Sequence, residues 1–146
     1  MTNPIRPILA NSCALAATAE EARFRIDRPI GARSALVLAL DEEAAGVVDR
    51  VAEQPWRGAR FVRAGDAVDL DDVDVVVMIA TADANADAAG PVAEACFERG
   101  IMTEGLILGE SADVAAAVSA LRPYARNLMV TDDEEDVAEV LTALRA

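Results

Sequence analysis

The chain has 146 residues, of which 53% are hydrophobic but only 3% aromatic, and its formal net charge is −13, from 26 acidic and 13 basic residues. This length fits one domain with an aliphatic core, and the negative charge argues against nucleic acid and anionic membranes as partners, since both require a basic protein surface. Every basic residue is arginine, so the chain lacks the histidine of a Ser–His or Cys–His pair and the lysine of a phosphate-binding loop, and no catalytic residue is expected.

The first part of the chain is predicted to be an arm. We expect it over residues 1–33, with a short helix at Cys13–Arg23 and a possible edge strand at Phe24–Asp27, ahead of a single α/β domain at residues 34–146. Its apolar side chains are too many for a bare tail in water. The arm either folds back on its own domain or reaches a neighbouring subunit. The second interpretation, which implies a homo-oligomer, is favoured because few aromatic residues are left for other recognition.

Strands and helices alternate from residue 34 onward. Apolar runs and turn residues predict strands at Ser34–Leu40, Ala59–Arg63, Asp74–Ala80, Thr103–Leu108 and Leu128–Val130. Helical spacing and caps predict helices at Glu43–Ala52, at Pro91–Arg99 with Pro91 in the first turn, from the cap Ser111 to near Pro123, and after a capping box of Thr131 and Glu134. Short connections between alternating elements require parallel strands, so the sequence predicts a three-layer, doubly wound (Rossmann-like) α/β fold.

Polar loops follow three of the predicted strands, at the edge where such folds bind ligands. The candidate ligand-binding residues in these loops are Asp41, Thr81, Asp83, Asn85, Asp87 and Asp132. One interpretation is that the carboxylates only cap helices and form a solvated rim. The other is a site for Mg²⁺ or Ca²⁺, with Asp83 and Asp87 as metal ligands, because crowded carboxylates favour a hard cation. The spacing Asp83-x-Asn85-x-Asp87 also overlays a calcium-binding loop, but Ala88 stands where that loop needs glycine.

The segments Val48–Asp66, Asp74–Leu108 and Ala120–Val130 resemble parts of the GTPase domain of FtsZ, the bacterial tubulin homologue. That family holds guanine nucleotide on glycine-rich turns, whose backbone N–H groups close around the phosphates. Here Asp41-Glu42-Glu43 and Thr81–Asp87 stand in place of the two glycine loops. The resemblance therefore implies a shortened relative that has lost the nucleotide site and binds no GTP.

These observations lead to a non-enzymatic α/β binding or accessory subunit as the first hypothesis, with a homo-oligomer or another protein as its partner. The alternative is a divalent-cation-dependent protein that binds a small molecule or nucleotide at the acidic edge of the sheet. A carboxylate-based enzyme ranks third, because no nucleophile and base are paired. No cofactor is predicted, although Mg²⁺ or Ca²⁺ is compatible with the acidic edge. Two cysteines at unrelated positions, Cys13 and Cys96, are typical of a reducing compartment, so we expect a cytoplasmic protein.

Overall fold

The computed structural model describes residues 31–82 and 86–146, and residues Gly31–Ala146 form one compact unit. The strands are β1 (Ala35–Ala39), β2 (Ala59–Arg63), β3 (Val75–Ala80), β4 (Met102–Leu108) and β5 (Asn127–Thr131). The helices are α2 (Glu42–Ala52), α3 (Ala86–Arg99), α4 (Ala115–Leu121) and α5 (Glu135–Ala143). The predicted arm, with its helix at Cys13–Arg23 and strand at Phe24–Asp27, lies outside the described residues. Within the two described ranges, no helix is long and apolar enough to cross a bilayer.

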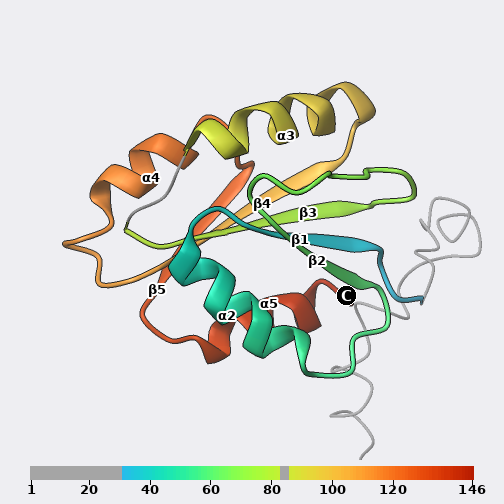
Figure 1. The fold of residues 1–146 in the computed structure, drawn as a ribbon, viewed down its shortest axis with the longest axis horizontal. Coiled ribbons are helices and arrows are strands. Elements are labelled where there is room, and N and C mark those ends of the chain that lie inside the picture. Colours follow the sequence, from blue (N-terminus) through green and yellow to red (C-terminus); the bar gives the residue numbers. More distant parts are fainter. Residues whose placement is uncertain (1–30, 83–85) are drawn as a thin grey trace, which may run out of the picture. The chain divides into compact units, whose positions relative to one another are not determined.

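The five strands form one parallel sheet in the order β2-β1-β3-β4-β5 (Figure 1). The central pair, β1 and β3, is buried along its whole length, as expected of strands covered on both faces. Their register places Leu38 opposite Met78 and Ala39 opposite Ile79. β2 is an edge strand, and it is less buried than β1 and β3. The predicted three-layer, doubly wound α/β fold is therefore confirmed.

The sheet separates two hydrophobic cores. Alternate residues of β1 serve both, because side chains of a strand point to opposite faces. Val37 packs in the core beneath α2 and α5, together with Val48 and Leu141. Leu36 packs in the core beneath α3 and α4, together with Leu121. Figure 1 shows these two helix pairs on opposite sides of the sheet. The result is a helix–sheet–helix sandwich filled by aliphatic side chains, as the composition predicts.

The start of β1 is fixed between its two neighbours by backbone contacts. The amide of Ala35 donates to the carbonyl of Gly58 at 2.8 Å, and the amide of Ser34 donates to the side chain of Asp74 at 3.0 Å. Gly58 leaves no space for a side chain, because a Cβ there would lie 2.1 Å from the carbonyl oxygen of Arg33. The beginning of β2 can therefore approach β1 closely only with glycine at this position.

The predicted start of α3 is wrong. The helix begins at Ala86, and Pro91 lies inside it instead of in its first turn. Proline has no N–H, so it removes one hydrogen bond from the helix and is commonest at a helix start. In α3 the helix extends for a further turn on the N-terminal side of the proline.

Two predicted caps are also wrong. Ser111 lies in a turn ahead of α4, and that helix begins after Val114 without a side-chain cap. The capping box of Thr131 and Glu134 does not form, because the Thr131 hydroxyl accepts from the amide of Asp133 and no side-chain hydrogen bond caps the start of α5. Glu134 instead forms an ion pair with Arg50 of α2, with 2.6 Å between the charged atoms. Hydrogen bonding to this carboxylate raises the pKa of Arg50.

Cys96 is fully buried in the core beneath α3 and α4. Burial raises the pKa of its thiol, because the thiolate would lose its hydration, whereas the nearby charge of Arg99 lowers it by a smaller amount. The side chain therefore acts as a small apolar residue of the core, as its position on the apolar face of the helix predicts.

Candidate functional site

The reversal of strand order lies between β1 and β3, where ligands bind in many doubly wound folds. Connections leave this point toward opposite faces of the sheet, since β1 leads into α2 and β3 leads toward α3. Asp41 follows β1, and Thr81 follows β3. The structure thus brings together two of the predicted site residues that are separated by 40 positions in the chain.

Asp41 and Thr81 form hydrogen bonds with each other at this point of the sheet. The Oδ2 atom of Asp41 accepts a hydrogen bond from the amide of Thr81 at 2.7 Å, and Oδ1 accepts one from the Thr81 hydroxyl at 3.0 Å. Oδ1 also accepts from the amide of Ala44 at 2.8 Å, which caps α2. Thr81 is 4% exposed. Because both carboxylate oxygens have protein donors, Asp41 is a structural connection between β1, α2 and β3.

The loop after β5 forms a second local network. The hydroxyl of Thr131 donates to a carboxylate oxygen of Asp136, and it accepts a hydrogen bond from the amide of Asp133 at 3.1 Å. The side chain of Asp133 accepts from the amide of Glu135 at 2.9 Å. These contacts secure the first turn of α5. Asp132, the predicted ligand from this loop, is exposed.

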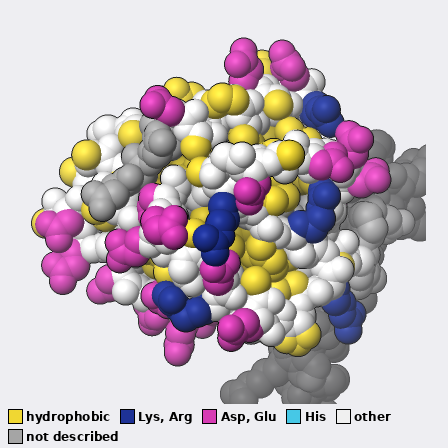
Figure 2. Space-filling view, in the orientation of Figure 1, with side chains coloured by type: hydrophobic (Ala, Val, Ile, Leu, Met, Phe, Trp, Pro, Cys, Tyr) yellow, Lys and Arg dark blue, Asp and Glu magenta, His cyan; other side chains and the backbone are white. Residues whose placement is uncertain are grey.

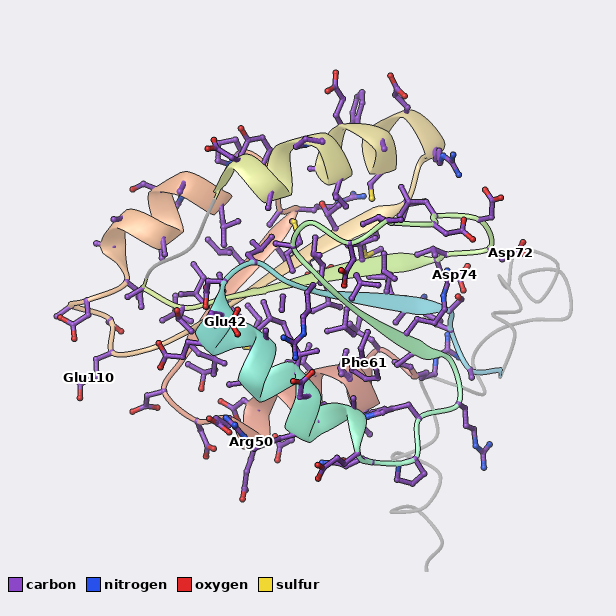
Figure 3. All side chains as sticks on the ribbon, in the orientation of Figure 1. Glu42, Arg50, Phe61, Asp72, Asp74 and Glu110 are labelled. Atoms are coloured by element: carbon purple, nitrogen blue, oxygen red, sulfur yellow. The ribbon has the colours of Figure 1, made fainter. Side chains whose placement is uncertain are left out.

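The other predicted site residues do not join this edge as one described cluster. Asp83 and Asn85 lie outside the described residues, and Asp87 is exposed in the first turn of α3. Across residues 31–82 and 86–146, no three Asp, Glu, Cys or His side chains are arranged to hold a metal ion. Figure 3 places Asp72 and Asp74 at the opposite end of the sheet from Glu42, where α2 starts. These two aspartates, which precede β3, therefore belong to the other edge of the sheet.

We predict that neither Mg²⁺ nor Ca²⁺ raises the melting temperature beyond the effect of matched ionic strength, because Asp41 and Asp133 accept hydrogen bonds from backbone amides and the described residues contain no group of carboxylates arranged to hold a metal ion. Thermal unfolding in MgCl₂, CaCl₂ and NaCl of equal ionic strength measures this. A bound ligand at about 100 times its Kd stabilises by about 2.7 kcal/mol, which such an assay resolves. Stabilisation by one cation that disappears in Asp83→Asn would contradict the prediction and identify a metal site.

A groove lies in the helical layer formed by α3 and α4, and the sequence analysis did not predict it. It has a volume of about 950 Å³ and runs between α3 and residues 123–126, with the start of β4 also lining it. We call it the α3 groove. Phe97 stands at this groove with 87% of its surface exposed, far more than any other large hydrophobic side chain of the described residues. The sequence does contain one sign that Phe97 is exposed. It lies between Glu94 and Glu98, and a phenylalanine between carboxylates lies on the polar face of a helix.

Small residues open the α3 groove. Gly90 and Ala93 line it from α3, and Ala125 lines it from the other wall. A Cβ at Gly90 would lie 3.6 Å from the ring of Tyr124, so the ring packs directly against the backbone of the helix. Glu94 and Arg126 bring one negative and one positive side chain to its lining. The groove is therefore mainly apolar with a charged residue on each wall.

No family model and no curated protein matches the chain. Solved structures with a similar fold include two response regulators. A response regulator from Thermotoga maritima is 10% identical over 77% of this chain and 97% of that one, with a TM-score of 0.47. A response regulator receiver protein from Pseudoalteromonas atlantica is 14% identical over 75% of this chain and 95% of that one, with a TM-score of 0.45. At these identities the likeness concerns the fold alone.

The predicted relationship to FtsZ is wrong: no family model matches the chain, and the solved structures named above are response regulators. The strand order agrees with this correction, because 2-1-3-4-5 is the flavodoxin-like order and differs from the Rossmann order 3-2-1-4-5-6. Two functional hypotheses fail with it: an accessory subunit that lost a nucleotide site, and a cation-dependent binder of nucleotides or small molecules. The sequence segments that suggested FtsZ match the general strand–helix alternation of α/β proteins.

Proposed function

We propose that this chain is a regulatory signalling domain that recognises a partner protein through the α3 groove. The observation that carries the proposal is the pairing of a mainly apolar groove with an aromatic side chain, Phe97, that is 87% exposed. Large exposed aromatic residues beside pockets are the usual anchors of protein interfaces. Contact between water and such a ring is unfavourable, so a partner that covers the ring gains the free energy of burying apolar surface.

A protein fits the α3 groove better than a small metabolite does. Small-molecule sites enclose most of the ligand and concentrate polar groups around it. Here the most prominent side chain, Phe97, projects into solvent, and only Glu94 and Arg126 bring charge to the lining. At the usual small-molecule position of this fold, the carboxyl ends of β1 and β3, the polar groups of Asp41 and Thr81 are bonded to each other.

The charge of the chain indicates the chemistry of the partner. The formal net charge is −13, and Figure 2 shows acidic side chains spread over the visible face with fewer arginines among them. Such a surface attracts basic proteins and speeds their association. We therefore expect the occupant to be a segment with a bulky apolar residue flanked by Lys or Arg. Regulatory function through such contacts is compatible with the fold shared with response regulators.

Peptides of defined sequence test the proposal. Each carries one central Leu or Phe, flanked by Lys in one set and by Glu in a matched set, and binding is followed by fluorescence anisotropy. We expect the basic set alone to bind, and Phe97→Ala to weaken binding by tenfold or more, since anchor residues contribute about 2 kcal/mol or more. Because Phe97 is exposed, its replacement should leave the melting temperature unchanged.

Glu139→Ala is the matched control, since Glu139 is an exposed residue of α5 on the opposite helical layer. It should bind the basic peptides as well as the wild type does. Equal binding by wild type and Phe97→Ala would overturn the assignment of the groove. NMR shifts that map the peptide to the loops after β1 and β5 would overturn it as well.

A further inference from the structure

The two edges of the sheet differ in how they are protected. β2, at one edge, carries Arg60 and Arg63, and each forms an ion pair with a nearby aspartate. β5, at the other edge, has the sequence Asn-Leu-Met-Val-Thr and contains no charged residue or proline. Charged side chains and prolines normally prevent edge strands from pairing with another chain. β5 lacks this protection, and it has only β4 as a neighbour among the described strands.

β5 also exposes apolar side chains. Met129 is 41% exposed and Val130 is 36% exposed, and with Phe97 they are the large hydrophobic residues that stand out as exposed in the described part of the chain. Phe97 belongs to the α3 groove. Met129 lies opposite Leu106 of β4 and so faces the α2 and α5 side of the sheet, whereas Val130 lies opposite Ile107 and faces the other side. Both faces of this edge therefore present apolar surface.

The backbone of β5 is oriented for pairing at its open edge. The amide of Gly109 on β4 donates to the carbonyl of Thr131 at 2.8 Å, so the carbonyl of Thr131 faces inward. Peptide groups alternate in direction along a strand, which turns those of Val130 and Leu128 outward. In an antiparallel pair, two residues with outward peptide groups face each other and exchange two hydrogen bonds. Val130 and Leu128 are thus the residues through which β5 would bond to another strand.

We propose that two copies of this chain pair through β5, antiparallel and centred on Met129, to form one continuous sheet across a two-fold axis. This register places Leu128 opposite Val130 of the second copy, in agreement with the outward direction of both peptide groups. It also brings Arg126, at the bend before the strand, to the same end of the pair as Asp132 of the second copy, at the bend after it. Both side chains are exposed. The same edge therefore supplies complementary charge at each end of the pair, which is the requirement for a self-complementary interface.

The second copy is a better occupant than an unrelated strand. The charges that flank β5 match only in this antiparallel register, because residues 126 and 132 are equally distant from Met129. The pairs of Leu128 and Val130 lie on one face of the sheet, and the two Met129 side chains meet on the other face. The net charge of −13 on each copy opposes association at low salt, so the dimer should strengthen as ionic strength rises.

Sedimentation equilibrium of the full chain at low and high NaCl tests the proposal. We expect a monomer–dimer equilibrium whose dissociation constant falls as salt rises. Met129→Glu places two carboxylates together on the axis and should raise this constant by about tenfold or more, a change of about 1.4 kcal/mol. Met129→Leu is the matched control and should dimerise like the wild type. A monomer under all conditions, including one in which another part of the chain covers β5, would overturn the proposal.

Charge reversal tests the register itself. Arg126→Asp alone places acid opposite acid at both ends, and Asp132→Arg alone places base opposite base, so each single variant should be monomeric. Mixing the two restores both pairs, and a heterodimer should form. A mixture that stays monomeric while the wild type dimerises would exclude this register. Circular dichroism of each variant shows that the fold is retained, and basic peptides should still bind to Met129→Glu, because the α3 groove does not include Met129.

Discussion

Replacing Asp41 by alanine is expected to lower the free energy of unfolding by about 2–4 kcal/mol. The loss has two parts. An N-cap contributes about 1 kcal/mol, and the amide of Thr81 becomes a buried donor without a partner, which costs about 1–3 kcal/mol. Urea unfolding followed by circular dichroism measures the change, and the m-value should stay constant because the surface exposed on unfolding does not change.

Thr81→Val is the matched variant. It removes only the hydroxyl donor and keeps both the amide of residue 81 and the cap of α2, so we expect a smaller loss of about 1 kcal/mol. The double variant Asp41→Ala/Thr81→Val should be less destabilised than the sum of the two, because both changes break the same contact. Strict additivity would show that the two side chains are not coupled and would contradict the proposed connection.

The second large effect is expected from Gly58→Ala, which should lower the free energy of unfolding by about 1–3 kcal/mol. The new methyl group would lie 2.1 Å from the carbonyl oxygen of Arg33. A backbone atom cannot move aside as the end of a flexible side chain can, so β1 and β2 must separate. The hydrogen bond from Ala35 to Gly58 lies at the same place and should weaken as well.

Gly46→Ala is the control, since it makes the same chemical change inside α2. The nearest atom to a Cβ there is the end of the Arg50 side chain at 3.6 Å, an ordinary contact. Alanine is favoured over glycine in a helix by about 0.5–1 kcal/mol, so this variant should be more stable than the wild type. Urea unfolding of both variants should therefore give shifts of opposite sign. A shift of the same sign in both would show that the close approach at Gly58 has no energetic effect.

The positions of the central strands could be predicted from the sequence, because strands buried on both faces consist of apolar residues. The predicted strands Ser34–Leu40 and Asp74–Ala80 are continuous apolar runs, and the structure buries both completely as β1 and β3. Helix starts were less predictable. Pro91 lies within α3 and Ser111 caps no helix, since several residues near each start satisfy the same local rules and tertiary contacts choose among them.

The candidate site was predicted only in part. The position of Asp41 and Thr81 at the carboxyl edge follows from strand order along the chain, but their contact requires β1 and β3 to be neighbours. A single sequence contains no direct record of that pairing. The α3 groove was missed for a different reason. It is formed where small residues such as Gly90 and Ala93 leave space. Small residues of this kind form no recognisable sequence motif, so the groove could not be predicted from them.

The contact between Asp41 and Thr81 has a consequence for folding. β1 and β3 are apolar on both faces, so their hydrophobic pattern would tolerate a shift of one strand along the other. A shifted pair would separate the carboxylate from its two donors on Thr81 and leave a polar amide buried without a partner. The correct register therefore has an energetic advantage that the aliphatic side chains alone do not provide. In this chain, a single polar residue at the end of an apolar strand selects one alignment of the central strands.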